Sequence, residues 1–157
     1  MEIHLLYINP GRNAKKVMED SREKVATAIN AEANEIVFTG SGTESNNMAI
    51  RGAAHSYKHR GNHIITSKIE HPSVLETCEA LEKEGFELTY INADENGIIK
   101  LDELEKAITD KTIMITIMYA NNEIGTIQPM KEIGLLAKKK NIIFHTDAVQ
   151  AVRNVRN

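Results

Sequence analysis

Cysteine, proline and aromatic residues are scarce in this chain of 157 residues, which has one cysteine, three prolines, no tryptophan and 4% aromatic residues. The single cysteine, Cys78, excludes an internal disulfide framework and a multi-cysteine zinc or iron–sulfur site, and it favours a reducing compartment. The few aromatic side chains leave little material for stacking nucleic-acid bases. We therefore expect a cytoplasmic protein whose core is packed mainly by aliphatic residues.

Strong charge of either sign is also missing. The chain has 19 Lys and Arg against 22 Asp and Glu, a net charge of -3 at pH 7, and no long basic run. It therefore lacks the electrostatic footprint of a nucleic-acid-binding surface. The apolar run at residues 1–8 is too short for a signal peptide or a membrane span. The sequence thus predicts one globular domain, with neither nucleic acid nor membrane as a partner.

Helix-like and strand-like segments alternate along the chain. Apolar residues at helical spacing predict helices, and short β-branched or continuously apolar runs predict strands between them. The expected helices are residues 14–29, 44–57, 73–83, 101–108 and 131–140, and the expected strands are residues 35–39, 63–67, 86–91, 113–119 and 142–145. This alternation favours a mainly parallel sheet with helices on both faces, which is a three-layer α/β/α fold.

Ligands of open α/β sheets bind at the carboxyl ends of the strands, so we expect functional residues in the loops that follow the strands. The turn Gly40–Glu44 after the first expected strand has small residues that let the backbone approach a ligand. The helix that starts there favours an anion such as phosphate. The alternative is an ordinary turn with Thr43 as the helix N-cap and Glu44 in the first helical turn.

Two further loops carry polar side chains. His71 stands just before a helix that Pro72 starts, and it could stack on a planar ligand or move a proton. It could equally be an exposed residue or a helix cap. Asn121 and Asn122 follow the long apolar strand, and a simple turn would explain them as well.

Asp147 lies just after the last expected strand, among apolar neighbours, where a carboxylate needs a cationic partner. It could pair with a protonated ring nitrogen of a cofactor, with Gln150 reaching the same ring, or it could cap a following helix. Residues 92–103 nearly match a calcium loop, but the segment before them alternates like a strand, whereas an EF-hand needs a helix there. The histidines and Cys78 show no zinc-ligand spacing. We expect no metal site.

Four segments together closely resemble the cysteine desulfurases, which are pyridoxal-phosphate (PLP) enzymes of the class V aminotransferase group. The segments are Phe38–Asn47, Ser67–His71, Asn121–Gly125 and His145–Gln150. They occur in family order and at family spacing, and four matches in order are far more specific than any one of them. The resemblance implies part of the large domain of a fold-type I PLP-dependent transferase.

The resemblance also implies roles for individual residues. The implied cofactor-binding residues are Gly42, Thr43, His71, Asn122, Asp147 and Gln150. Thr43 and its turn would bind the cofactor phosphate, and His71, the one implied catalytic residue, would stack on the pyridine ring. Asp147 would keep the ring nitrogen protonated, so that the ring acts as an electron sink. Asn122 and Gln150 would face the ring substituents.

The family converts L-cysteine to L-alanine and passes the sulfur on as a persulfide, toward iron–sulfur clusters or tRNA thiolation. Its Schiff-base lysine lies in a Ser-x-His-Lys segment beyond the Asp-x-x-Gln motif, and its sulfur-accepting cysteine lies in a later loop. This sequence contains neither, and Cys78 within a predicted helix is expected to be a buried structural thiol. The expected organisation is a residual N-terminal segment at 1–12 and a partial PLP-binding large domain at 13–157, without the small C-terminal domain.

We therefore expect a desulfurase-like fragment, truncated at both ends, that binds PLP weakly and non-covalently and is inactive alone. Because the family is dimeric, the fragment should self-associate or pair with a complementary desulfurase fragment. The alternatives are a non-enzymatic interaction module and one half of a split desulfurase with a lysine-bearing partner. Nucleotide binding is a weaker alternative, because the sequence has no dinucleotide fingerprint.

Overall fold

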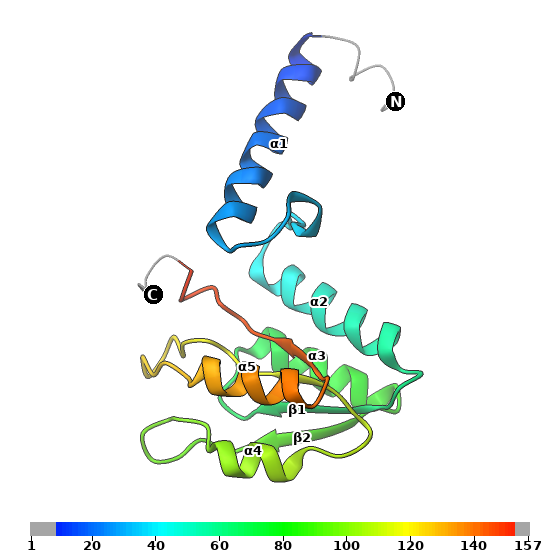
Figure 1. The fold of residues 1–157 in the computed structure, drawn as a ribbon, viewed down its shortest axis with the longest axis vertical. Helices are drawn as coiled ribbons and strands as arrows, with labels where there is room; N and C mark the ends of the chain where they lie inside the picture. Colours follow the sequence, from blue (N-terminus) through cyan, green and yellow to red (C-terminus); the bar gives the residue numbers. More distant parts are fainter. Residues whose placement is uncertain (1–8, 153–157) are drawn as a thin grey trace. The chain divides into compact units, whose positions relative to one another are not determined.

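The computed structural model describes residues 9–152, which form two compact units that divide between Thr39 and Gly40 (Figure 1). The first unit contains the helix α1 (Asn9–Ala28) and the short 3-10 helix η1 (Ala33–Glu35). The helix predicted at 14–29 is confirmed, although it begins earlier, at Asn9. What the sequence predicts for residues 1–8 and 153–157 lies outside the described residues. Within residues 9–152, each helix is too short or too polar to cross a membrane.

The strand predicted at residues 35–39 is wrong. The 3-10 helix occupies Glu35, and the residues after it are irregular although Ile36 has an extended backbone. Arg22 donates a hydrogen bond to the carbonyl of Ile36, and its guanidinium lies 4.9 Å from the ring centroid of Phe38. Strand propensity acts through pairing with neighbouring strands, and no other described strand pairs with this segment.

The second unit is built around a four-stranded sheet with the order β2-β1-β3-β4. Its strands are β1 (His63–Ser67), β2 (Glu87–Ile91), β3 (Thr112–Thr116) and β4 (Ile143–His145). All three pairings are parallel, which confirms the predicted sheet and brings the carboxyl ends of the strands to one edge. The third strand ends at Thr116, before the predicted end at residue 119.

Two helices cover each face of this sheet. The helices are α2 (Gly42–Tyr57), α3 (Pro72–Lys83), α4 (Leu101–Ala107) and α5 (Met130–Lys139). Ile64 of β1 and Met114 of β3 belong to a core cluster with α2 and α3, whereas Ile65 and Ile115 belong to a second cluster with α4 and α5. Because side chains alternate between the faces of a strand, both faces are apolar, and the predicted α/β/α layers are confirmed.

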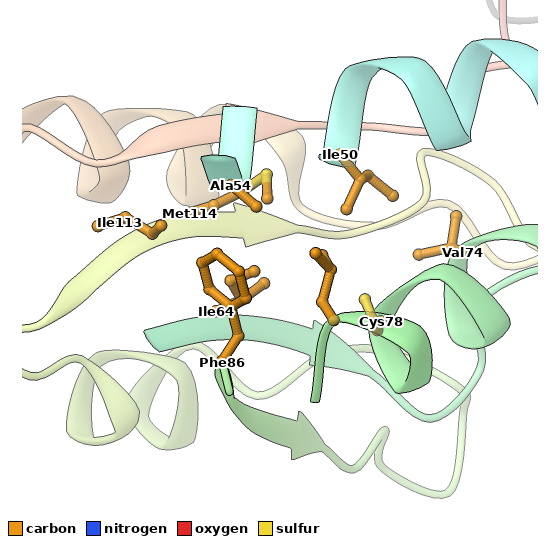
Figure 2. Packing of buried hydrophobic residues seen from close by; sticks show 9 residues of the cluster. Ile50, Ala54, Ile64, Val74, Cys78, Phe86, Ile113 and Met114 are labelled. Carbon is orange, nitrogen blue, oxygen red and sulfur yellow. The ribbon is translucent and has the colours of Figure 1, made fainter. Parts of the chain in front are cut away.

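The first of these clusters is drawn in Figure 2. Ile50 and Ala54 of α2 and Val74 and Cys78 of α3 project toward Ile64 on the sheet. Burial raises the pKa of the Cys78 thiol to about 12, so the thiol stays protonated at neutral pH. Cys78 is therefore the buried structural thiol that the sequence predicts.

The amphipathic helix α5 provides a test of the core. Ile133 on its inner face is 0% exposed, whereas Leu135 is 59% exposed. We expect Ile133→Ala to lower the free energy of unfolding by about 2–4 kcal/mol because it leaves a cavity, and Leu135→Ala to change it by less than about 0.5 kcal/mol. Urea unfolding followed by circular dichroism measures both values. Equal losses in the two variants would contradict the described packing of α5.

Candidate active site

A pocket of about 270 Å³ lies at the edge of the sheet where the strands end. The segments that follow β1, β3 and β4 and the start of α2 form its walls. Its lining residues are Gly42, Thr43, Asn46, His71, Ser73, Met118, Ala120, Asn122, Asp147, Val149 and Gln150. The structure thus brings together all six site residues predicted from the sequence. It adds five others that were not predicted.

The start of α2 contributes one wall of the pocket. Ser41 is the N-cap, because its side chain accepts a hydrogen bond from the Glu44 amide at 3.2 Å. The alternative with Thr43 as N-cap is therefore wrong, whereas Glu44 does lie in the first turn. The Glu44 carboxylate turns back and accepts from the Gly40 amide at 2.6 Å. Thr43 lines the pocket beside amide groups at a helix start, where an anion is favoured.

His71 both caps α3 and lines the pocket. Its Nδ1 accepts a hydrogen bond from the backbone amide of Ser73 at 3.1 Å, and Pro72 occupies the first helical position. Nδ1 also lies 2.8 Å from the Ser73 hydroxyl. The capping alternative is thus correct, but it uses only one of the two ring nitrogens. The rest of the imidazole remains available to a ligand in the pocket.

The carboxylate of Asp147 is held by two N–H donors. Its Oδ2 accepts from the side-chain amide of Asn46 at 2.8 Å, and its Oδ1 accepts from the backbone amide of Val149 at 3.1 Å. The second bond closes a turn after β4, so the helix-capping alternative is not what the described residues show. Asp147 forms no ion pair within residues 9–152. Its negative charge can therefore be balanced by a cationic group of a ligand.

Asn46 and Ser73 were missed from the sequence although both are buried, at 5% exposure each. The same amide nitrogen of Asn46 donates to Asp147 and, at 2.9 Å, to the Ser73 hydroxyl. A signal was present, because Asn46 shares the buried stripe of α2 with Ile50 and Ala54 at a spacing of four residues. A polar residue in an apolar stripe needs a buried partner.

Two neighbouring asparagines in the loop after β3 make different contacts. Asn121 is structural, since its Oδ1 accepts from the amides of Glu123 and Ile124 and its Nδ2 donates to the Ile69 carbonyl at 2.8 Å. These bonds form the turn that the simpler interpretation predicts. Asn122 is the member of the pair that lines the pocket.

Glu70 lies close to the pocket and is 6% exposed. Its Oε1 accepts from the Ser67 hydroxyl at 2.5 Å and from the Met118 amide at 3.0 Å. Burial raises the pKa of Glu70 to about 7, against the lowering effect of these two bonds and with a smaller contribution from the charge of Asp147. The sequence pattern predicts no role for this residue.

This arrangement is typical of α/β proteins that bind a ligand at the carboxyl edge of a parallel sheet. Comparison with known families shows to which family of such proteins the chain belongs. The sequence profile of the aminotransferase class-V family matches residues 4–156, and the chain is a member of that family.

Several curated relatives are cysteine desulfurases. Cysteine desulfurase IscS of Clostridium botulinum strain Hall is 56% identical over 141 residues, which cover 90% of this chain and 36% of the relative. The enzyme of the same name from Methanosarcina thermophila is 56% identical over 145 residues, covering 92% of this chain and 36% of the relative. The chain thus spans little more than a third of the length of these relatives.

Solved structures agree with the fold. A NifS-like protein superposes with a TM-score of 0.88 at 42% identity, over 92% of this chain and 40% of that one. A structure of SspA in complex with cysteine gives a TM-score of 0.86 at 42% identity, over 92% of this chain and 44% of that one. These likenesses confirm the expected fold as part of a PLP-dependent transferase.

Enzymes of this family use pyridoxal 5′-phosphate, and the chemistry of the pocket fits that cofactor. A phosphate suits the start of α2, where a Cβ atom on Gly42 would come 3.1 Å from Cγ2 of Val149, so glycine keeps the wall open. A protonated pyridine nitrogen suits the Asp147 carboxylate. Among residues 9–152, no group of three His, Cys, Asp or Glu side chains is placed to hold a metal ion.

The buried Glu70 generates a prediction on pH and stability. Its pKa is about 7 in the folded chain against an ordinary value of 4.5, so the folded state holds a proton that the unfolded state releases between these values. The stability that this group contributes is complete below about pH 4.5 and is lost as the pH rises through 7. Glu70→Gln removes the titrating group and should abolish this loss.

We expect the free energy of unfolding of Glu70→Gln, relative to that of the unmodified chain, to rise by about 2–3 kcal/mol between pH 4.5 and pH 8. Urea unfolding across this pH range measures the difference. Glu105→Gln, at an exposed position on α4, is the matched control and should follow the unmodified chain. Parallel pH curves for Glu70→Gln and the unmodified chain would show that Glu70 has no raised pKa.

Proposed function

We propose that this chain forms the cofactor-binding part of a PLP-dependent cysteine desulfurase. One observation carries the proposal: a single pocket joins the start of α2, the His71 imidazole and the Asp147 carboxylate, which forms no ion pair with the described residues. Each of these groups matches one part of the cofactor, namely its phosphate, its ring face and its ring nitrogen.

Different residues of the pocket would hold different parts of the cofactor. The helix start with Gly42 and Thr43 would bind the phosphate, and His71 would stack on the ring. Asp147 would accept a hydrogen bond from the protonated ring nitrogen, and Asn122 and Gln150 would meet the ring substituents. The bound cofactor would supply an electron sink for negative charge that develops on an amino-acid substrate.

The proposed parent reaction is the conversion of L-cysteine to L-alanine, with the sulfur leaving as a persulfide for iron–sulfur cluster assembly or tRNA thiolation. The names of the curated relatives support this substrate class, as does the similar structure that is described as a complex with cysteine. A cytoplasmic setting and a homodimeric parent enzyme belong to the same proposal.

We further propose that the chain by itself binds PLP non-covalently and does not release sulfur. No lysine lines the pocket within residues 9–152, so no described amine is placed there to bond the cofactor aldehyde. Cys78 is buried and protonated, and it cannot serve as the sulfur acceptor.

The first test is a titration of the full chain with PLP, followed by absorbance. We expect saturable binding that Asp147→Asn weakens about tenfold or more, because the negative charge that would pair with the protonated ring nitrogen is lost. Asp102→Asn, at an exposed position on α4, is the control and should bind PLP like the unmodified chain. Borohydride treatment should leave no stoichiometric pyridoxyl adduct. An adduct at one lysine, for example Lys68 in the neighbouring depression, would contradict non-covalent binding.

A second candidate role is that of one half of a split desulfurase, or of an interaction module. The observation that favours it is exposed apolar surface near the pocket, where Ile124 is 57% and Val149 69% exposed. Exposed apolar side chains at this place are available to a partner. The strand β4 also forms one edge of the described sheet, so its outer side can accept another strand.

Mixing the chain with a lysine-bearing complementary fragment of a related desulfurase tests this role. We expect a complex in size-exclusion chromatography and the appearance of sulfide release from cysteine, which neither fragment shows alone. Val149→Asp should weaken the complex, whereas Val17→Asp, at an exposed position of α1 in the first unit, should leave it intact. If no complex forms at concentrations of tens of micromolar, the pairing role is wrong.

A further inference from the structure

A continuous set of hydrogen bonds joins Asp147 to His71 through two residues that sequence analysis gave no role. The side-chain nitrogen of Asn46 lies 2.8 Å from Oδ2 of Asp147 and 2.9 Å from the hydroxyl of Ser73. The same hydroxyl lies 2.8 Å from Nδ1 of His71. The set therefore connects α2, the start of α3 and the segment after β4 at one edge of the pocket.

The direction of each bond follows from the chemistry of the groups. An ionised carboxylate only accepts, so the atom of Asn46 that faces Asp147 must be the NH2 group, whose second hydrogen is directed to Ser73. The Ser73 oxygen thus accepts from Asn46, and its own O–H is free to donate to Nδ1 of His71. The backbone amide of Ser73 also donates to Nδ1, at 3.1 Å. Nδ1 is therefore the acceptor, and the proton of neutral His71 is on Nε2.

We propose that Asn46 is a positioning residue of this site, whose single amide group orients the Asp147 carboxylate and directs the Ser73 hydroxyl toward Nδ1 of His71. Asn46 is 5% exposed, so water does not compete for these bonds. The consequence for the cofactor rests on the proposed function, because it requires a ring nitrogen to face Asp147. The hydrogen-bond set itself exists in the ligand-free chain and can be tested there.

The first measurement uses the ligand-free full chain. Long-range 1H–15N spectra of the His71 ring, assigned with His71→Gln and recorded at a pH where the ring is neutral, should show a protonated Nε2 and an unprotonated Nδ1. In Asn46→Leu the Nδ1 signal should move, because the Ser73 hydroxyl is no longer oriented by an N–H donor. Asn47→Leu, one position along the same helix and only partly buried, should leave the signal in place, because the Asn47 side chain bonds to the Thr43 carbonyl and not to Ser73. A protonated Nδ1, or no movement in Asn46→Leu, would overturn the proposal.

The second measurement compares two probes, PLP and its 1-deaza analogue, in which carbon replaces the ring nitrogen. If Asn46 acts through Asp147, Asn46→Leu should weaken PLP binding about fivefold to tenfold and leave binding of the analogue nearly unchanged, as Asp147→Asn should do. Equal weakening of both probes would show that Asn46 only supports the fold, and it would overturn the proposal. If neither probe binds the unmodified chain, the proposed function fails, while the spectra of His71 still decide the role of Asn46.

Discussion

The parallel pairing of β1, β3 and β4 is the constraint from which the candidate site follows. Since the three strands run in one direction, the segments that leave their carboxyl ends begin at one edge of the sheet. His71, Asn122 and Asp147 come from these three segments and meet in one pocket. The two apolar faces of the sheet require a helical layer on each side. That requirement places α2 over the sheet with its first residues at the same edge.

Two acidic side chains near this pocket, Glu70 and Asp147, differ in their burial and in their hydrogen-bond partners. Glu70 is buried, and burial raises its pKa to about 7, so it can be neutral where a charge would be costly. Asp147 is partly accessible, accepts from two N–H groups and has no described cationic partner. The charge of Asp147 makes a smaller contribution to the raised pKa of Glu70. A site that must present one negative charge to a ligand is therefore helped by a neighbour that can hold a proton.

Most of the fold could be predicted because the spacing of apolar residues within each helix or strand indicates its type. The buried stripe of α2 and the apolar strand β1 are examples that a short stretch of sequence shows. Residues 35–39 have the same local signal as a strand, but pairing is a long-range property, and no described strand pairs with them. The six site residues could be named because their motifs resemble a family. Asn46 was missed because it contacts Asp147, 101 residues further along the chain, and no local pattern shows such a contact.

The local bonds of His71 and Asp147 leave part of each side chain for the pocket. His71 uses Nδ1 to cap α3, which leaves Nε2 and the ring face for the pocket. Asp147 uses Oδ1 to close the turn after β4, and Oδ2 is shared with Asn46 at the pocket wall. A side chain that is anchored by one atom has lost its rotamer freedom before a ligand arrives. The ordering cost of binding a ligand in this pocket would therefore be lower, so the bonds that build the local structure would also favour binding.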